Sequence, residues 1–327
     1  MNQFWRDMGI AAVMGLIVPA VLLAGVVSVS SEQREIPEVT ESTPPSSAPT
    51  ETVDQTMMIL VQNRDGSVVE MELNSYLTCV VLAEMPVSFE AEALKAQSVV
   101  ARTYALRAMS GASKHENAAV CMNSGCCQGY MSSDDYVTRG GNENSISYVR
   151  NLVDATDGDV LTYDGELIEA TYFSCSGGTT EDAVAVWGTD VPYLQSVSSP
   201  GEERATYYTD TVSFTASDFS VKLGGELKGK PSSWFGTVTY TEGGGVEFIE
   251  IGGVSYKGTQ LRKLLGLRST AFEITTDGDT IYITTRGYGH RVGMSQYGAD
   301  AMAASGSNYV QILTYYYQGT KLTKHAD

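Results

Sequence analysis

The sequence predicts an α+β fold: mixed helices and antiparallel β-hairpins in a two-lobed extracytoplasmic domain behind one transmembrane helix. Three observations lead to this prediction. An uncharged apolar run near the N-terminus is long enough to span a bilayer, two helical segments meet at a proline, and alternating apolar runs flank Asp-Gly pairs, a strong hairpin signal. At 327 residues the chain is long enough for one large or two modest domains.

The apolar run covers residues 9–29, GIAAVMGLIVPAVLLAGVVSV. A bilayer-spanning helix needs roughly 20 such residues, whereas the apolar core of a cleaved signal peptide has about 7–15. No convincing small-x-small cleavage site follows, so a single-pass anchor is favoured over a signal peptide. Arg6 precedes the run and acidic residues follow it, so the positive-inside rule weakly puts the N-terminus in the cytoplasm.

The composition changes along the chain. After the apolar run the sequence is rich in Ser, Thr, Pro and Glu and has almost no large apolar residues, so it cannot bury enough surface to fold. We therefore expect six segments: a short cytoplasmic N-terminus (1–8), the transmembrane helix (9–29), a disordered stalk (30–56), a catalytic core (57–200), a β-rich second lobe (201–286) and a C-terminal part that returns to the core (287–327).

The charge balance excludes some partners. The chain has 39 acidic and 21 basic residues, which argues against nucleic acid or a polyanionic surface as the main partner. Any attraction to an anionic ligand must therefore be local.

The stretch from Tyr76 to Met109 is predicted to form two helices separated by Pro86, because proline disfavours helical geometry at the residue before it. Glu84 would end the first helix, where the helix dipole and partial burial both favour the protonated acid. Glycosidic bond cleavage needs such an acid to protonate the leaving oxygen. A lone Glu at a helix end is, however, more often a solvated surface residue.

The second helix carries polar residues on one side. Lys95 and Arg102 are seven residues apart, two turns along the same side, and Gln97 and Tyr104 lie on neighbouring stripes. This pattern predicts a cationic rim beside Glu84.

The segment HENAAVCMNSGCCQGY supplies four candidate metal ligands: His115, Cys121, Cys126 and Cys127. Thiolates with an imidazole suit a tetrahedral Zn²⁺ ion, and four protein ligands would leave no open position for water, so the role would be structural. The spacing is not a standard zinc pattern. A disulfide in an extracytoplasmic compartment and a set of unpaired thiols stay open as alternatives. Cys79 and Cys175 are expected to be buried as small apolar residues.

Two further segments have candidate binding residues. Ser174 and Ser176 precede paired glycines, which let a backbone approach a ligand closely, although such turns are also ordinary loops. Tyr193 could stack on a sugar, although core packing is the commoner role. His290 lies in the glycine-punctuated segment GYGHRVGMSQYG, before a helix that Ser295 could cap.

Three motifs in order carry a resemblance to a known family: AEMP followed by EALKAQSVVARTYAL, then SCSGGTTEDAVAVWGTDVPYLQSVSSP, then GYGHRVGMSQYGADAMAASG. Together they resemble the stage II sporulation protein D (SpoIID) family, membrane-anchored lytic transglycosylases of endospore-forming bacteria, over about residues 57–322. The resemblance implies that Glu84 is catalytic, that Ser174, Ser176 and Tyr193 belong to the substrate cleft, and that His290 packs against the active-site region, touching substrate or bracing a loop. Members often carry a second His where this chain has Cys126, so a His2Cys2 zinc site would become His1Cys3.

The resemblance implies cleavage of the MurNAc–GlcNAc bond in peptidoglycan strands that lack stem peptides, giving 1,6-anhydro-MurNAc ends during engulfment. Ordinary glycosidases need two carboxylates, but one is enough here because the C6 hydroxyl of MurNAc is the nucleophile. Lys95 and Arg102 would meet the lactyl carboxylates or the developing charge. The resemblance further implies a location at the mother-cell membrane and two partners, a peptide-stripping amidase and a polytopic membrane protein. The alternatives are a noncatalytic amidase-enhancer-type module acting on a partner hydrolase, and a zinc hydrolase using the cysteine loop.

Overall fold

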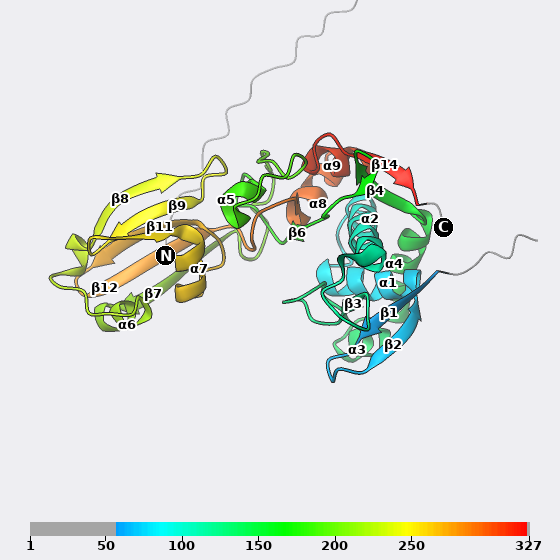
Figure 1. Ribbon diagram of the computed structural model, residues 1–327, viewed down its shortest axis with the longest axis horizontal. Coiled ribbons are helices and arrows are strands. Elements are labelled where there is room, and N and C mark those ends of the chain that lie inside the picture. The colour runs from blue at the N-terminus through cyan, green and yellow to red at the C-terminus, as the bar shows by residue number, and fades with distance from the viewer. Residues whose placement is uncertain (1–56, 326–327) are drawn as a thin grey trace, which may run out of the picture. The chain divides into compact units, whose positions relative to one another are not determined.

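The computed structural model describes residues 57–325 (Figure 1). The predicted cytoplasmic N-terminus (1–8), transmembrane helix (9–29) and stalk (30–56) lie outside the described residues. Within residues 57–325, no helix has the length and apolar character needed to cross a bilayer.

The structure confirms a mixed α+β fold with mainly antiparallel sheets. The elements up to residue 200 are β1 (Met58–Gln62), β2 (Val68–Glu72), α1 (Leu73–Glu84), α2 (Ala91–Arg107), a π-helical turn (Ala108–Ala112), β3 (Val120–Cys121), α3 (Ser133–Thr138), α4 (Glu143–Ala155), β4 (Asp159–Tyr163), β5 (Glu166–Leu167), β6 (Tyr172–Phe173) and α5 (Ala183–Trp187).

The elements after residue 200 are β7 (Thr209–Thr215), α6 (Ala216–Lys222), a 3-10 turn (Pro231–Ser233), β8 (Phe235–Tyr240), β9 (Val246–Ile251), β10 (Val254–Lys257), α7 (Gly258–Leu265), β11 (Ala271–Asp277), β12 (Thr280–Arg286), β13 (Met294–Ser295), α8 (Gln296–Ala304), α9 (Tyr309–Tyr316) and β14 (Lys321–Lys324).

The hairpins predicted at the Asp-Gly pairs, which are residues 65–66, 164–165 and 277–278, are confirmed. β1 pairs with β2, β4 with β5, and β11 with β12, all antiparallel. Asp164 and Gly165 both have positive φ, 50° and 87°, which a two-residue turn between twisted strands requires. Two short parallel pairings were not predicted: β1 with β3, and β6 with β13. The second of these aligns Phe173 with Ser295 and so joins two distant parts of the sequence.

Helix α1 ends where the sequence predicts. Glu84 is its last residue, and Met85 is extended (φ −125°, ψ 141°), as the following Pro86 demands. At its start, the side chain of Glu72 caps the helix by accepting the Ser75 N–H.

Helix α2 is enclosed by other elements. It packs against α1, α4, α8, α9 and β4, and Figure 1 shows it among them. Its many alanines let these neighbours approach closely, so most of its residues are buried. This burial determines which α2 side chains can meet a ligand.

Buried apolar side chains form two clusters. One joins α1, α2, α4, α8 and α9, and the other lies between Phe219 and Ile283, over β7 to β12 with α6 and α7. The predicted lobe boundaries at 200/201 and 286/287 stay a prediction. Cys79 and Cys175 are buried free thiols, as expected of small apolar residues.

Candidate functional site

Glu84 lines two adjoining hollows. The larger, of about 670 Å³, is also lined by Tyr104, Lys114 and Trp187, and the smaller, of about 190 Å³, by Phe89 and Tyr207. Both share four lining residues: Glu84, Ser174, Tyr288 and Gln296. The two hollows therefore meet at Glu84, and together we call them the Glu84 groove.

The Glu84 carboxylate is half-buried and fixed on one side. The Gly129 N–H donates to its Oε1 atom at 2.5 Å. A Cβ atom at position 129 would lie 2.7 Å from Oε1, so this close approach requires glycine. The Tyr172 hydroxyl is the other protein group beside this carboxylate among the described residues. One oxygen is thus held by a backbone N–H, and a hydroxyl lies next to the carboxylate.

Tyr172 lies beside this carboxylate in the groove. Burial first, and then the charge of Glu84, raise the pKa of Tyr172 well above 10. Its neutral hydroxyl donates to Gln128 Oε1 at 3.3 Å. The structure thus places a neutral hydrogen-bond donor next to Glu84 that the sequence did not reveal.

Three of the predicted substrate-binding residues line the groove with Glu84: Tyr104, Ser174 and His290. The His290 ring lies 5.7 Å from the Phe173 ring and 5.4 Å from the Trp187 ring, measured between centroids. Burial, and then the charge of Arg262, lower the pKa of His290 to about 4. Its Nδ1 accepts the Val292 N–H at 3.1 Å, so the neutral ring carries its proton on Nε2.

The predicted cationic rim is wrong, because α2 is packed on nearly every side. The Arg102 side chain is 1% exposed, and its guanidinium donates to Thr156 O at 2.6 Å and Val153 O at 3.1 Å. It therefore caps the C-terminal end of α4. The partly exposed Lys95 lines neither hollow and pairs with Glu92 at 2.8 Å.

Three other predicted residues lie behind the groove wall. Gln97 is buried, and its Oε1 accepts from Gln296 Nε2 at 3.4 Å. Tyr193 accepts the Glu169 N–H at 3.0 Å, and Glu169 lines the larger hollow. Ser176 is buried as well. None of the three lines either hollow, so their contacts support the wall rather than a ligand.

Ser176 serves a carboxylate that sequence analysis missed. Its N–H and Oγ donate to Glu202 Oε2 at 2.7 and 2.9 Å, and the Gly177 N–H donates at 3.0 Å. Ser199 Oγ donates to the other oxygen at 2.6 Å. A fully buried carboxylate with four donors fixes the loop that carries Ser174. No local signal marks Glu202, since its partners lie up to 26 residues away.

Sequence analysis also missed Lys114. Of the described residues that line the Glu84 groove, it is the only one with a permanent positive charge. Its Nζ donates to Cys126 O at 2.7 Å, which holds the ammonium beside the groove. Its position next to His115 could have drawn attention to it.

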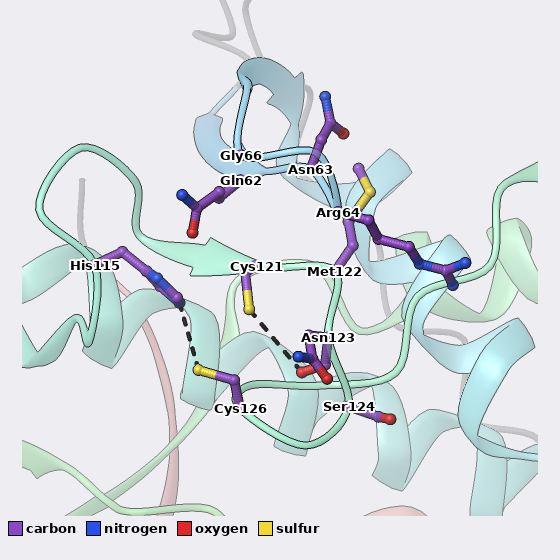
Figure 2. Close-up of a pocket in the computed structure, with 10 residues that line it drawn as sticks. All are labelled: Gln62, Asn63, Arg64, Gly66, His115, Cys121, Met122, Asn123, Ser124 and Cys126. Atoms are coloured by element: carbon purple, nitrogen blue, oxygen red, sulfur yellow. Dashed lines mark hydrogen bonds between the residues drawn. The ribbon is translucent and has the colours of Figure 1, made fainter.

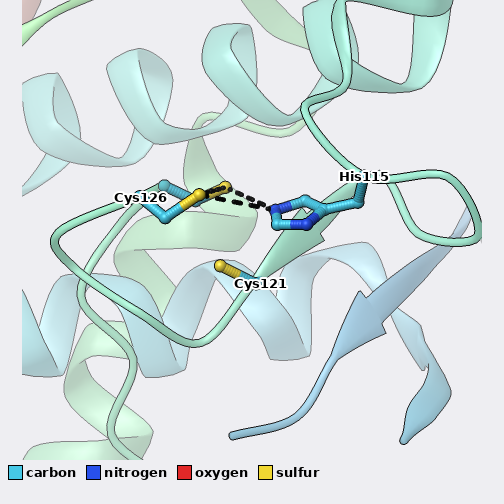
Figure 3. A group of neighbouring side chains, drawn as sticks. His115, Cys121 and Cys126 are labelled. Carbon is cyan, nitrogen blue, oxygen red and sulfur yellow. Dashed lines mark hydrogen bonds between the residues drawn. The ribbon is translucent and has the colours of Figure 1, made fainter. Parts of the chain in front are cut away.

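The four predicted metal ligands converge, and Figure 3 shows three of them, His115, Cys121 and Cys126. His115 Nε2 lies 3.3 Å from Cys127 Sγ and 3.7 Å from Cys126 Sγ, the two sulfurs are 4.0 Å apart, and all four ligand atoms lie within 4.8 Å of one another. With Zn–S near 2.3 Å and Zn–N near 2.0–2.1 Å, a tetrahedron separates its ligand atoms by roughly 3.5–3.8 Å. The cluster therefore fits a zinc-sized ion with little movement.

The thiols of this cluster differ in their environment. Although burial opposes it, the hydrogen bond with His115 lowers the pKa of Cys127 to about 7, whereas burial raises the pKa of Cys121 to about 11. A metal ion would have to displace the Cys121 proton. The described cysteines are all free thiols, so the structure does not contain the alternative disulfide.

A third hollow, of about 580 Å³, lies against the metal-ligand loop (Figure 2). This hollow is lined by the loop and by the β1–β2 turn, including Gln62 and Arg64. Ser124 and Cys126 line both this hollow and the Glu84 groove. The candidate metal site is therefore part of the groove wall.

Comparison with known proteins gives consistent relatives. The profile of the SpoIID family, stage II sporulation protein, matches residues 62–163. Stage II sporulation protein D of Bacillus subtilis (strain 168) is 38% identical, over 99% of this chain and 96% of that protein. Its counterpart in Bacillus amyloliquefaciens is 40% identical, over 79% and 76%. The amidase enhancer of Bacillus subtilis (strain 168) is 29% identical, over 74% of this chain and 39% of its own length.

Proposed function

The chain belongs to the stage II sporulation protein D family, and from this premise we propose that it is a peptidoglycan lytic transglycosylase of engulfment. Its substrate is the MurNAc–GlcNAc bond of glycan strands that lack stem peptides. The observation that carries the proposal is the position of Glu84, half-buried where two hollows meet, with one carboxylate oxygen held by the Gly129 N–H and the Tyr172 hydroxyl beside it.

One carboxyl group is enough for the reaction. Glu84 first gives its proton to the glycosidic oxygen as the bond from that oxygen to C1 of MurNAc breaks. The resulting carboxylate then takes the proton of the MurNAc C6 hydroxyl while O6 bonds to C1. Glu84 ends protonated as it began, no water is consumed, and the product is a 1,6-anhydro-MurNAc end.

Other groove residues support an anionic glycan without stem peptides (a stripped glycan) as the substrate. Lys114 is a cation positioned to meet a lactyl carboxylate, a role that the buried Arg102 cannot take. The neutral hydroxyl of Tyr172 and the neutral imidazole of His290 are polar groups that can contact the glycan without adding a charge to the groove. We assign Ser174 and Tyr104 to substrate contact, and Gln97, Ser176 and Tyr193 to support of the wall.

The proposed cofactor is one Zn²⁺ ion held by His115, Cys121, Cys126 and Cys127. When bound, it would crosslink the loop, with all four positions taken by protein, and so keep the groove wall in place. We further propose that the chain is two-lobed and anchored by residues 9–29, with its N-terminus cytoplasmic. Its proposed partners are a peptide-stripping amidase and a polytopic membrane protein.

The test is mass spectrometry of the products formed from stripped glycan strands. The wild-type chain should give anhydro-muramic ends, and Glu84→Gln should give none while still binding glycan. Glu169→Gln is the matched control, because Glu169 is an exposed carboxylate in the same groove. Reducing ends that require both residues would mean a hydrolase with two carboxylates.

A second candidate is supported by the amidase enhancer of Bacillus subtilis (strain 168), at 29% identity. In that case the chain would bind glycan without cleaving it and would stimulate a separate hydrolase. The absence of any product from the wild-type chain, with glycan binding intact, would favour this function.

A further inference from the structure

Two large aromatic side chains beside Glu84 remain in contact with solvent. Tyr207 is 42% exposed and Tyr288 is 39% exposed, and both line the smaller hollow. Their ring centroids are 5.5 Å apart with an interplanar angle of 84°. Burying such rings would be favourable, so their exposure at a groove indicates a surface available for a ligand.

These rings are held rigidly by a guanidinium group. The Arg268 guanidinium lies 3.7 Å from the Tyr207 ring centroid and 5.0 Å from that of Tyr288. The Arg268 Nε–H donates to Asp210 Oδ2 at 2.7 Å, which fixes the guanidinium in turn. The two exposed rings thus form a built platform.

The backbone also fixes Tyr288. Its N–H donates to Cys175 O at 2.7 Å, and the Cys175 N–H donates back at 3.2 Å. The flanking Gly287 and Gly289 have φ of 80° and 123°, and a Cβ at either would come within 2.6 Å of Ser176 O or Phe173 Cβ. This approach sets Tyr288 beside the Ser174 loop and leaves its ring in the groove.

A further exposed aromatic residue lies in the other hollow. Trp187 is 45% exposed and lines the larger hollow, its ring centroid 5.4 Å from that of His290. Tyr288 lines both hollows, and Tyr207 lines the smaller one. Exposed aromatic surface therefore extends to both sides of Glu84.

We propose that Tyr207 and Tyr288, backed by Arg268, form a sugar-binding subsite next to Glu84, which takes one N-acetylhexosamine of a glycan strand against its rings. The C–H face of a pyranose is apolar and suits an aromatic surface, while its hydroxyl and acetamido groups stay solvated at the rim. This inference rests on the proposed function for the identity of the glycan.

The test separates binding from cleavage. In the Glu84→Gln background, calorimetry would measure the affinity of the chain for stripped glycan oligosaccharides of defined length. Tyr207→Ala should weaken binding about 3- to 10-fold, the value expected for one stacking contact. Tyr207→Phe keeps the ring and should restore the affinity. Tyr240→Ala is the control, because Tyr240 is 57% exposed on β8 and lines none of the three hollows described above.

The outcomes test the sugar-binding subsite separately from the proposed transglycosylase activity. Equal affinity for the Tyr207→Ala and Tyr240→Ala variants, with intact melting temperatures, would overturn the subsite whether or not the wild-type chain cleaves. A parent variant that binds no glycan would overturn it as well. A wild-type chain that does not cleave, together with weaker binding by Tyr207→Ala alone, would keep the subsite and remove the transglycosylase.

Discussion

Arg102→Ala should destabilise the fold rather than impair substrate recognition selectively. The guanidinium donates to the carbonyls of Thr156 and Val153 and to Asn74 Oδ1 at 3.1 Å, all from a buried position. Leaving a buried acceptor without a donor costs about 1–3 kcal/mol, so the two carbonyls alone account for roughly 2–6 kcal/mol. The ion pair with the mostly exposed Asp157, at 3.8 Å, adds little.

One effect opposes this loss. Burial lowers the pKa of Arg102, which means that desolvation penalises its charge, and removing the charge removes that penalty. We therefore expect a net cost of about 2–4 kcal/mol in the free energy of unfolding. For a domain of this size that corresponds to a fall in the melting temperature of roughly 10 °C.

The assay is thermal and urea unfolding at neutral pH, with Lys95→Ala as the matched control. Lys95 and Glu92 form a partly exposed pair at 2.8 Å, and such pairs contribute about 0–1 kcal/mol. The control should therefore change the melting temperature by no more than a few degrees. Wild-type stability of Arg102→Ala combined with a selective loss of affinity for stripped glycan would refute this reasoning and restore Arg102 to the binding site.

The remaining predictions concern the groove and its wall. Lys114→Ala should weaken binding of stripped glycan about 10- to 100-fold but leave neutral chitooligosaccharides unaffected, since a single charged hydrogen bond is lost; calorimetry with Lys114→Arg as control checks this, and an equal loss for both ligands contradicts it. Chelation should release one zinc ion per chain and lower the melting temperature, whereas Cys121→Ser should bind less zinc from the start; a melting temperature unchanged by chelator would count against a structural metal. The stability of the fold should decrease as the pH drops from about 6.5 to about 4, because in that window His290 binds a proton in the unfolded chain but not in the folded chain. Urea unfolding at several pH values across this range should show that the free energy of unfolding changes less with pH in His290→Gln than in the wild-type chain. An equal change with pH would mean that other groups cause the loss of stability.

Local rules explain which elements were predicted from the sequence. Pro86 ends α1 at Glu84, and Ser295 caps α8 by accepting the Gly298 N–H. In each case the residue acts through its own backbone or through neighbours within one turn. The same locality explains the metal cluster, whose four members lie within 13 residues of sequence.

The spacing of Lys95 and Arg102 shows the limit of such reasoning. A separation of seven residues correctly puts two side chains on one side of a helix, but it does not say what covers that side. Because α4 and β4 pack onto α2, the Arg102 end is buried while the Lys95 end stays partly exposed. Periodicity gives relative positions within an element, and tertiary contacts decide which of them reach a ligand.

The groove could not be predicted as a unit because long-range contacts assemble it. The parallel pairing of β6 with β13 is only two residues long, too short to leave a periodic pattern, yet it brings Ser174 and Gln296 to the wall that faces Glu84. The buried Glu202 then fixes the Ser174 loop through Ser176 and Gly177. A hydroxyl beside paired glycines looks the same in the sequence whether it serves a sugar or a buried carboxylate. Only the partner, 26 residues further along the chain, distinguishes the supporting role of Ser176 from the position of Ser174 in the groove lining.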